Sequence, residues 1–170
     1  MIMGYKKLGI FILIVLGSMT ASAQNDLKLN FKNSIVYAGI EVGSKGVKMS
    51  VIEVNRKNKK GPVYQIVKDT AINSDFISFS EPTFYSTLDA MGTLFNKALK
   101  QYDITSDRIF TVVSSGVKAQ ADKENKTIWI KNLADSFNLR ITEPSRNINV
   151  IEVAEEARLS HLGIVPDDRR

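Results

Sequence analysis

The segment 35–54 constrains the fold most, because two apolar, β-forming runs flank the short turn Gly43-Ser44-Lys45-Gly46. This pattern predicts a β-hairpin. Glycines permit positive φ or a close backbone approach, and the serine and lysine place a hydroxyl and an ammonium beside backbone N–H groups that can face an anion. The turn is therefore either a phosphate contact or an ordinary turn built from common turn residues.

The first residues have the features of a secretory signal peptide. Lys6 and Lys7 precede an apolar run at 8–16, and small residues follow at 21–23. The run is well short of the roughly 20 residues that span a bilayer. We therefore expect residues 1–23 to be removed, giving an exported protein, periplasmic or extracellular, without a membrane attachment.

Charge and composition narrow the function classes. The formal charge is +5 for 23 basic and 18 acidic residues, and it becomes 21 − 18 = +3 without residues 1–23. Basic residues cluster at 56–60 with no aromatic residue among them, which favours a solvated turn over a nucleic-acid groove but leaves attraction to a polyanion open. Without cysteine the chain has no disulfide, thiolate metal site or cysteine nucleophile. The single histidine, His161, gives little support for a histidine metal site or a Ser-His-Asp triad.

The remaining pattern predicts alternating helices and strands in one domain over 35–165, after a polar lead-in at 24–34. Apolar residues recur every three to four positions at 84–102, which indicates an amphipathic helix that Thr83 could cap. A continuous apolar run at 107–114 indicates a strand buried on both faces, with a parallel neighbour. The other expected elements are a strand at 62–70, a helix at 122–137 that contributes Ile128 and Trp129 to the core, a strand at 148–153 and a helix at 154–162.

This element order predicts an α/β fold. Three antiparallel strands followed by alternating helix and strand give a mixed five-stranded sheet with helices, the ribonuclease H-like arrangement that is also found in each half of sugar kinases and actin-like ATPases.

Three segments resemble the amino-terminal domain of the exopolyphosphatase and guanosine pentaphosphate phosphohydrolase (Ppx/GppA) family. They are AGIEVGS at 38–44, IFTVVSSGVK at 109–118 and VIEVAEEARL at 150–159. The family reads Asp-x-Gly-Ser-Asn-Ser, Ala-Thr-x-Ala-x-Arg and Ser-Gly-x-Glu-Glu-Ala-Arg-Leu at these places. The third segment is the most specific, because Glu-Glu-Ala-Arg-Leu recurs intact at 155–159.

The resemblance implies a metal-dependent phosphohydrolase site. By analogy with the family, Glu41 would help to hold a divalent metal ion, Mg²⁺. Glu156 would be the general base for the attacking water. Phosphate would contact the hairpin turn and the end of the buried strand, through Gly43, Ser44, Lys45, Ser115, Gly116 and Lys118. Spacing alone also allows Glu155 and Glu156 to be favourable first-turn residues of a helix.

The sequence departs from the family pattern at several of these positions, including Lys45, where the family has Asn. Glu41 stands where the family has Asp, which lengthens the carboxylate arm, and Lys118 replaces an Arg, which exchanges a planar fork for a point charge. Nothing in the sequence matches the Asp-Ile-Gly-Gly-Gly-Ser-x-Glu loop of the family's second domain. We therefore expect an exopolyphosphatase-like domain that binds phosphate or polyphosphate without the second half of the active site. The alternative is a non-catalytic polyanion-binding module, or one that pairs with a second ribonuclease H-like domain or with its own copy.

Overall fold

The computed structural model describes residues 27–55 and 64–164. The expected signal peptide at 1–23 and the basic turn at 56–60 lie outside the described residues, so both stay predictions. Within the described part of the chain, no helix is both long and apolar enough to cross a bilayer.

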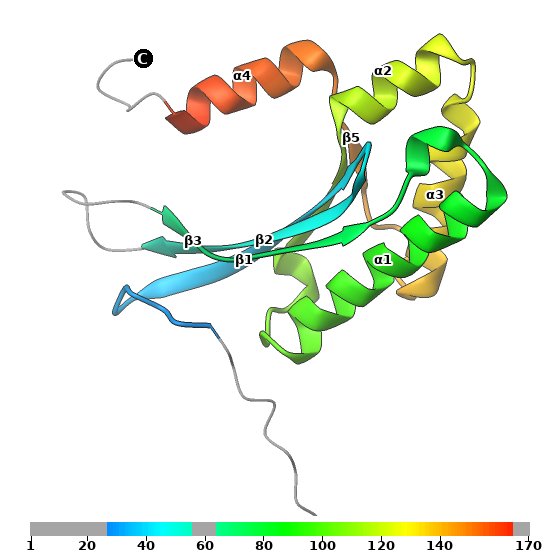
Figure 1. Ribbon diagram of the computed structural model, residues 1–170. Helices are drawn as coiled ribbons and strands as arrows, with labels where there is room; N and C mark the ends of the chain where they lie inside the picture. The colour runs from blue at the N-terminus through cyan, green and yellow to red at the C-terminus, as the bar shows by residue number, and fades with distance from the viewer. Residues whose placement is uncertain (1–26, 56–63, 165–170) are drawn as a thin grey trace, which may run out of the picture.

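Five strands form one mixed sheet in the order β3-β2-β1-β4-β5 (Figure 1). The strands β1 (Ser34–Gly43), β2 (Gly46–Asn55) and β3 (Tyr64–Asn73) are antiparallel neighbours. The strand β4 (Ile109–Val113) runs parallel to β1, and the short β5 (Asn149–Val150) runs parallel to β4. The predicted hairpin and the predicted mixed five-stranded sheet are confirmed.

The core lies on one face of this sheet, against α1 (Glu81–Lys100), which packs in turn on α3 (Thr127–Arg140). Alternate strand residues point into it because side chains of a strand alternate between the two faces. The buried core residues of the hairpin strands are Ala38, Ile40, Val42, Val47, Met49 and Val51.

The helix α1 begins three residues earlier than the sequence pattern predicts. Its N-cap is Ser80, which shares a capping box with Thr83, so the expectation that Thr83 itself caps the helix is wrong. Pro82 lies inside the first turn, where a missing N–H costs no helical hydrogen bond. Apolar periodicity alone could not locate this first turn, since it is polar and exposed.

The helix expected at 122–137 corresponds to α3, which begins only at Thr127, and a further helix that was not expected, α2 (Ser115–Lys123), precedes it. The chain turns at Asn125, whose φ of 56° lies in the left-handed region that asparagine tolerates. The N–H of Lys126 then donates to the carbonyl of Ala121 at 2.7 Å, which closes the turn.

The other face of the sheet is open. Phe110 of β4 is 54% exposed and Ile66 of β3 is 57% exposed, so the expectation that β4 is buried on both faces is wrong. The helix α4 (Val153–Ile164) lies on the side of the sheet away from α1 (Figure 1), and its described side chains, at 153–161, are exposed. It contacts α2 rather than covering the strands.

The strand β3 forms one edge of the described sheet and carries a bulge. Val51 pairs with Lys68 while the next residue, Ile52, pairs with Ile66, so Val67 is the extra residue. The bulge shifts the register between the two halves of this edge strand.

Arg146 ties the loop before β5 to the start of β4. The loop before β4 contains the short helix η2 (Ser106–Arg108), and the guanidinium donates to the Ser106 carbonyl at 2.8 Å and to the Ile109 carbonyl. It also donates to Glu143 at 2.7 Å and lies 5.0 Å from the ring centroid of Phe95. The side chain is 11% exposed, so it acts as an internal cross-link.

Candidate phosphate-binding site

The hairpin turn consists of Ser44 and Lys45, because Gly43 pairs with Gly46 across the strands. No glycine of the described residues has a positive φ. The glycine at 46 serves a close approach instead, since a Cβ there would lie 2.4 Å from the carbonyl oxygen of Ile72 on β3. The sequence allows these glycines either a positive φ or a close backbone approach, and the structure shows the close approach at Gly46.

Two hollows flank this turn. One has a volume of about 290 Å³ and is lined by Glu41 and residues 43–48 of the hairpin and by residues 71–73 at the facing end of β3. The other, of about 480 Å³, is lined by Lys45, Asn73, Ser74 and Asp75. The N–H of Ser74 donates to the Lys45 carbonyl at 3.1 Å, which fixes the turn against the end of β3.

Lys45 is the uncommitted cation of these hollows. Its side chain is exposed and forms no ion pair with any described residue. Lys48 lines the first hollow too, but its ammonium lies 3.9 Å from the Asp69 carboxylate. An anion in either hollow could therefore pair with Lys45, although a carboxylate also lines each hollow, Glu41 in the first and Asp75 in the second.

The N-terminus of α2 lies at the same end of the sheet. β1 and β4 are parallel, with Val42 paired to Val113, and the N–H of Ser114 donates to the Val42 carbonyl at 3.0 Å. Ligands of open α/β sheets bind beyond the carboxyl ends of such strands. The hairpin turn and the start of α2 are thus neighbours at a sheet end that suits a ligand.

Glu156 contacts the start of α2. The N–H of Ser115 donates to a Glu156 carboxylate oxygen at 3.3 Å, which brings α4 to this end of the sheet. Beside it, Lys118 forms ion pairs with Asp122 and, at 3.4 Å, with Glu152. The hydrogen bond to Asp122, helped by the attraction of both carboxylates, raises the pKa of Lys118.

The predicted phosphate residues therefore form two groups. Gly43, Ser44 and Lys45 line the hollow at the hairpin, while the second group, Ser115, Gly116, Lys118 and Glu156, surrounds the start of α2. The hollow beside the hairpin does not include Glu156 among its lining residues. In the second group, the Ser115 N–H and the Lys118 ammonium already contact carboxylates of the chain itself. The first group is therefore more accessible to an added anion.

Glu41 is not part of a group of side chains, among the described residues, that could hold a metal ion. It is exposed on the open face of β1, and its cross-strand partner is Lys48. Within residues 27–55 and 64–164, no three His, Cys, Asp or Glu side chains are close enough together to hold a metal ion. Mg²⁺ takes several oxygen ligands in octahedral geometry. One carboxylate facing an ammonium does not fit that ion, and we derive no step through it.

Sequence reasoning missed the acidic partners of Lys118. The pair with Asp122 has i,i+4 spacing on α2 and could have been found had the helix been predicted to begin at Ser115. Glu152 joins through the tertiary fold and carries no local signal.

Comparison with known proteins supports the fold. No protein-family model and no curated protein matches this sequence. Among solved structures, the chain is similar to the Ppx/GppA family member of Aquifex aeolicus, with 15% identity and a TM-score of 0.56 over 78% of this chain and 40% of that chain. An exopolyphosphatase from Cytophaga hutchinsonii has 14% identity and a TM-score of 0.51 over 74% and 36% of the two chains. An exopolyphosphatase-like protein has 16% identity and a TM-score of 0.50 over 79% and 38%.

These similarities bear on architecture. The predicted ribonuclease H-like arrangement is confirmed, and the resemblance to Ppx/GppA proteins that three short segments indicated holds at the level of the fold. The chain spans about 40% of the length of the Aquifex aeolicus protein.

Proposed function

We propose that this chain is an exported, exopolyphosphatase-like domain that binds inorganic phosphate or the end of a polyphosphate at the hairpin turn. One observation carries the proposal: the exposed Lys45, without an ion-pair partner among the described residues, lines the hollows beside a turn that adjoins the start of α2. An ammonium, a hydroxyl and backbone N–H groups are the donors that a phosphate group needs.

The start of α2 would supply the second contact. The amide of Ser115 already donates to a carboxylate, so an anionic oxygen is its present partner. A helix N-terminus favours negative charge for the same reason. A phosphate that reached from Lys45 to Ser115 would displace Glu156, and the freed carboxylate could then orient a water.

Hydrolysis requires more than this half-site. The solved structures with this fold include the exopolyphosphatase from Cytophaga hutchinsonii, and the chain covers 36% of that protein. We propose that a second ribonuclease H-like domain or a second copy supplies the opposite wall and the oxygen ligands that Mg²⁺ would need, since Glu41 does not fit that ion. Without it, the chain is a phosphate-binding module, because positioning supplies most of the catalysis in phosphoryl transfer.

A pairing role has its own support in the open face. Phe110 and Ile66, on β4 and β3, are 54% and 57% exposed, and Leu159, on α4 at the same side of the sheet, is 43% exposed. Large exposed apolar side chains that gather on one face are typical of interaction surfaces. Light scattering of the purified protein would test the homodimer, and a monomer at all concentrations would exclude it.

Binding is tested by titrating medium-length polyphosphate into the protein at low salt, with calorimetric detection. We expect Lys45→Ala to weaken binding by about two- to fivefold, because a solvent-exposed ion pair contributes roughly 0.4–1 kcal/mol. Lys100→Ala, at the far end of α1, is the matched control and should bind like the wild type. Equal affinity of all three proteins would remove the hairpin from the proposal.

Catalysis and export need separate tests. Phosphate release from polyphosphate with magnesium should be slower in Glu156→Gln than in the wild type if the chain hydrolyses its ligand. Equal release from the wild type and the variant would leave only the binding part of the proposal.

Amino-terminal sequencing of the exported protein should begin at Gln24, and a retained Met1 would refute removal of the leader.

A further inference from the structure

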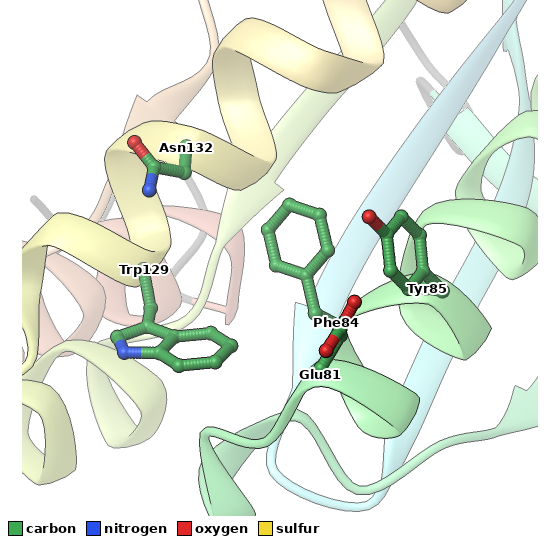
Figure 2. A pocket seen from close by; sticks show the side chains of 5 residues that line it. All are labelled: Glu81, Phe84, Tyr85, Trp129 and Asn132. Carbon is green, nitrogen blue, oxygen red and sulfur yellow. The ribbon is translucent and has the colours of Figure 1, made fainter.

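A third hollow, away from the sheet end, lies between the first turns of α1 and α3. It has a volume of about 320 Å³ and is lined by Glu81, Phe84, Tyr85, Trp129 and Asn132. The two helices place these residues opposite each other, with Phe84 seen between Trp129 and Tyr85 in Figure 2. The hollow is independent of the phosphate proposal, since it shares no residue with it.

The three rings form walls at steep angles to one another. Phe84 and Tyr85 are 5.5 Å apart between centroids with planes at 89°, and Phe84 and Trp129 are 6.0 Å apart at 68°. Tyr85 is 54% exposed and Trp129 is half-buried, so the rings remain accessible. Three aromatic rings that line one hollow at different angles, rather than one flat platform, can surround a compact cation.

Charge complements this geometry. The Glu81 carboxylate lines the hollow and forms no ion pair or side-chain hydrogen bond with any described residue. The hollow's other polar side chain, Asn132, is neutral. The nearest lysine along α3, Lys131, is paired with Asp135 at 2.7 Å. Among the described residues that line the hollow, the only formal charge is therefore negative.

The same aromatic cluster already holds one cation at its other end. Phe79 lies 6.4 Å from Trp129 between centroids, and the Lys126 ammonium lies 5.3 Å from the Phe79 centroid. Lys126 is also paired with Glu124 at 2.9 Å. The Lys126 ammonium is thus held by an aromatic ring, Phe79, and a carboxylate, Glu124. The hollow offers the same two kinds of group to a ligand.

We propose that this hollow binds an organic ammonium group, with Phe84, Tyr85 and Trp129 facing the cation and Glu81 balancing its charge. A trimethylammonium head or a primary alkylammonium fits the chemistry, and the two differ in origin. Free choline-like molecules carry the first, and lysine side chains of a partner protein carry the second.

Trp129 makes the test direct because the chain has one tryptophan. Its indole N–H gives a single resolved NMR peak, which reports ligand titrations at the hollow without assignment of the whole spectrum. We would titrate choline, butylammonium and the uncharged isostere of choline, 3,3-dimethylbutan-1-ol. Each ring contact with a cation is worth about two- to fivefold in affinity at an exposed site, so we expect choline or butylammonium to bind at least about fivefold more tightly than the alcohol.

Variants separate the two contributions. Glu81→Gln should weaken the cations about three- to fivefold and leave the alcohol unchanged, while added NaCl should weaken the cations in the wild type only. Tyr85→Leu should weaken the cations about two- to fivefold. Phe110→Leu is the matched control, because Phe110 is also 54% exposed but lies on the open sheet face.

The outcomes decide the proposal. Preference for choline assigns the hollow to free quaternary amines, and preference for butylammonium assigns it to lysine side chains. Equal binding of the alcohol, or cation shifts that survive in both Glu81→Gln and Tyr85→Leu, would show an apolar recess at the rim of the core and overturn the proposal.

Discussion

Glu53 is a buried carboxylate whose replacement should destabilise the protein strongly. It lies on the core face of β2 and has no exposed surface. One oxygen accepts the N–H of Phe31 at 2.9 Å, and the other accepts the N–H of Asn30 at 2.9 Å and the Gln65 amide at 2.6 Å. The carboxylate therefore fastens the segment before β1 to the two neighbouring strands.

Glu53→Gln keeps the shape and removes the charge. Its amide NH₂ must face at least one backbone N–H, and a hydrogen bond to a charged acceptor contributes about 1.5–3 kcal/mol. We expect the free energy of unfolding to fall by about 2–3 kcal/mol at pH 7, measured by urea denaturation. Glu41→Gln, an exposed glutamate on β1, should change it by less than about 0.5 kcal/mol. A Glu53→Gln protein as stable as the wild type would refute the reasoning.

The pH dependence gives a second test of Glu53. Burial alone would raise the pKa of Glu53, but hydrogen bonds from Asn30, Phe31, Ser34 and Gln65 outweigh it and hold the pKa below 4.5. The unfolded chain then binds the proton more readily, so the stability from Glu53 is present above pH 4.5 and is lost as the pH falls through the folded pKa. The stability gap between wild type and Glu53→Gln should narrow from about pH 5 to about pH 3.

Three further substitutions test the packing at Gly46, the cross-link made by Arg146 and the acid sensitivity that comes from Glu143. Gly46→Ala should cost about 1–3 kcal/mol in urea denaturation because its Cβ would meet the Ile72 carbonyl at 2.4 Å, whereas Gly39→Ala, with no atom within 4 Å, should cost much less. Arg146→Lys should lower the free energy of unfolding by about 2–3 kcal/mol, because lysine cannot reproduce the fork; full stability would contradict the cross-link. The hydrogen bond from the Ser106 hydroxyl, with the Arg146 guanidinium, outweighs burial and lowers the pKa of Glu143, so Glu143→Gln should be less acid-sensitive than the wild type between about pH 5 and pH 3 in thermal melts.

The sequence predicts the sheet well because its strands are defined by local alternation. The runs at 35–54 and 62–70 and the helix at 84–102 carry periodicity that needs no tertiary information, and each has its counterpart in the structure. The start of α2 at Ser115 was not predicted, because only two residues of this helix, Val117 and Ala121, are buried. Two apolar positions are too few to show a helical periodicity in the sequence.

The site was less predictable because its geometry depends on contacts distant in sequence. The contact between Glu156 and Ser115 spans 41 residues, and the pairing of Lys118 with Glu152 spans a similar distance. Ile128 was expected in the core but is 55% exposed, because α3 turns Ile130 and Leu133 inward instead. A helix's inward face depends on its neighbours, which a single sequence does not specify.

The bulge in β3 has a consequence for solubility at high concentration. A ten-residue strand at a sheet margin, with Tyr64 and Ile66 about half exposed, could recruit an identical strand from another molecule and nucleate fibrils. The extra residue Val67 interrupts the regular spacing of backbone donors and acceptors, and charged Lys68 and Asp69 follow it at once. An incoming strand would meet two short, mismatched edges instead of one long one, so we expect this irregularity to disfavour association of two molecules through β3.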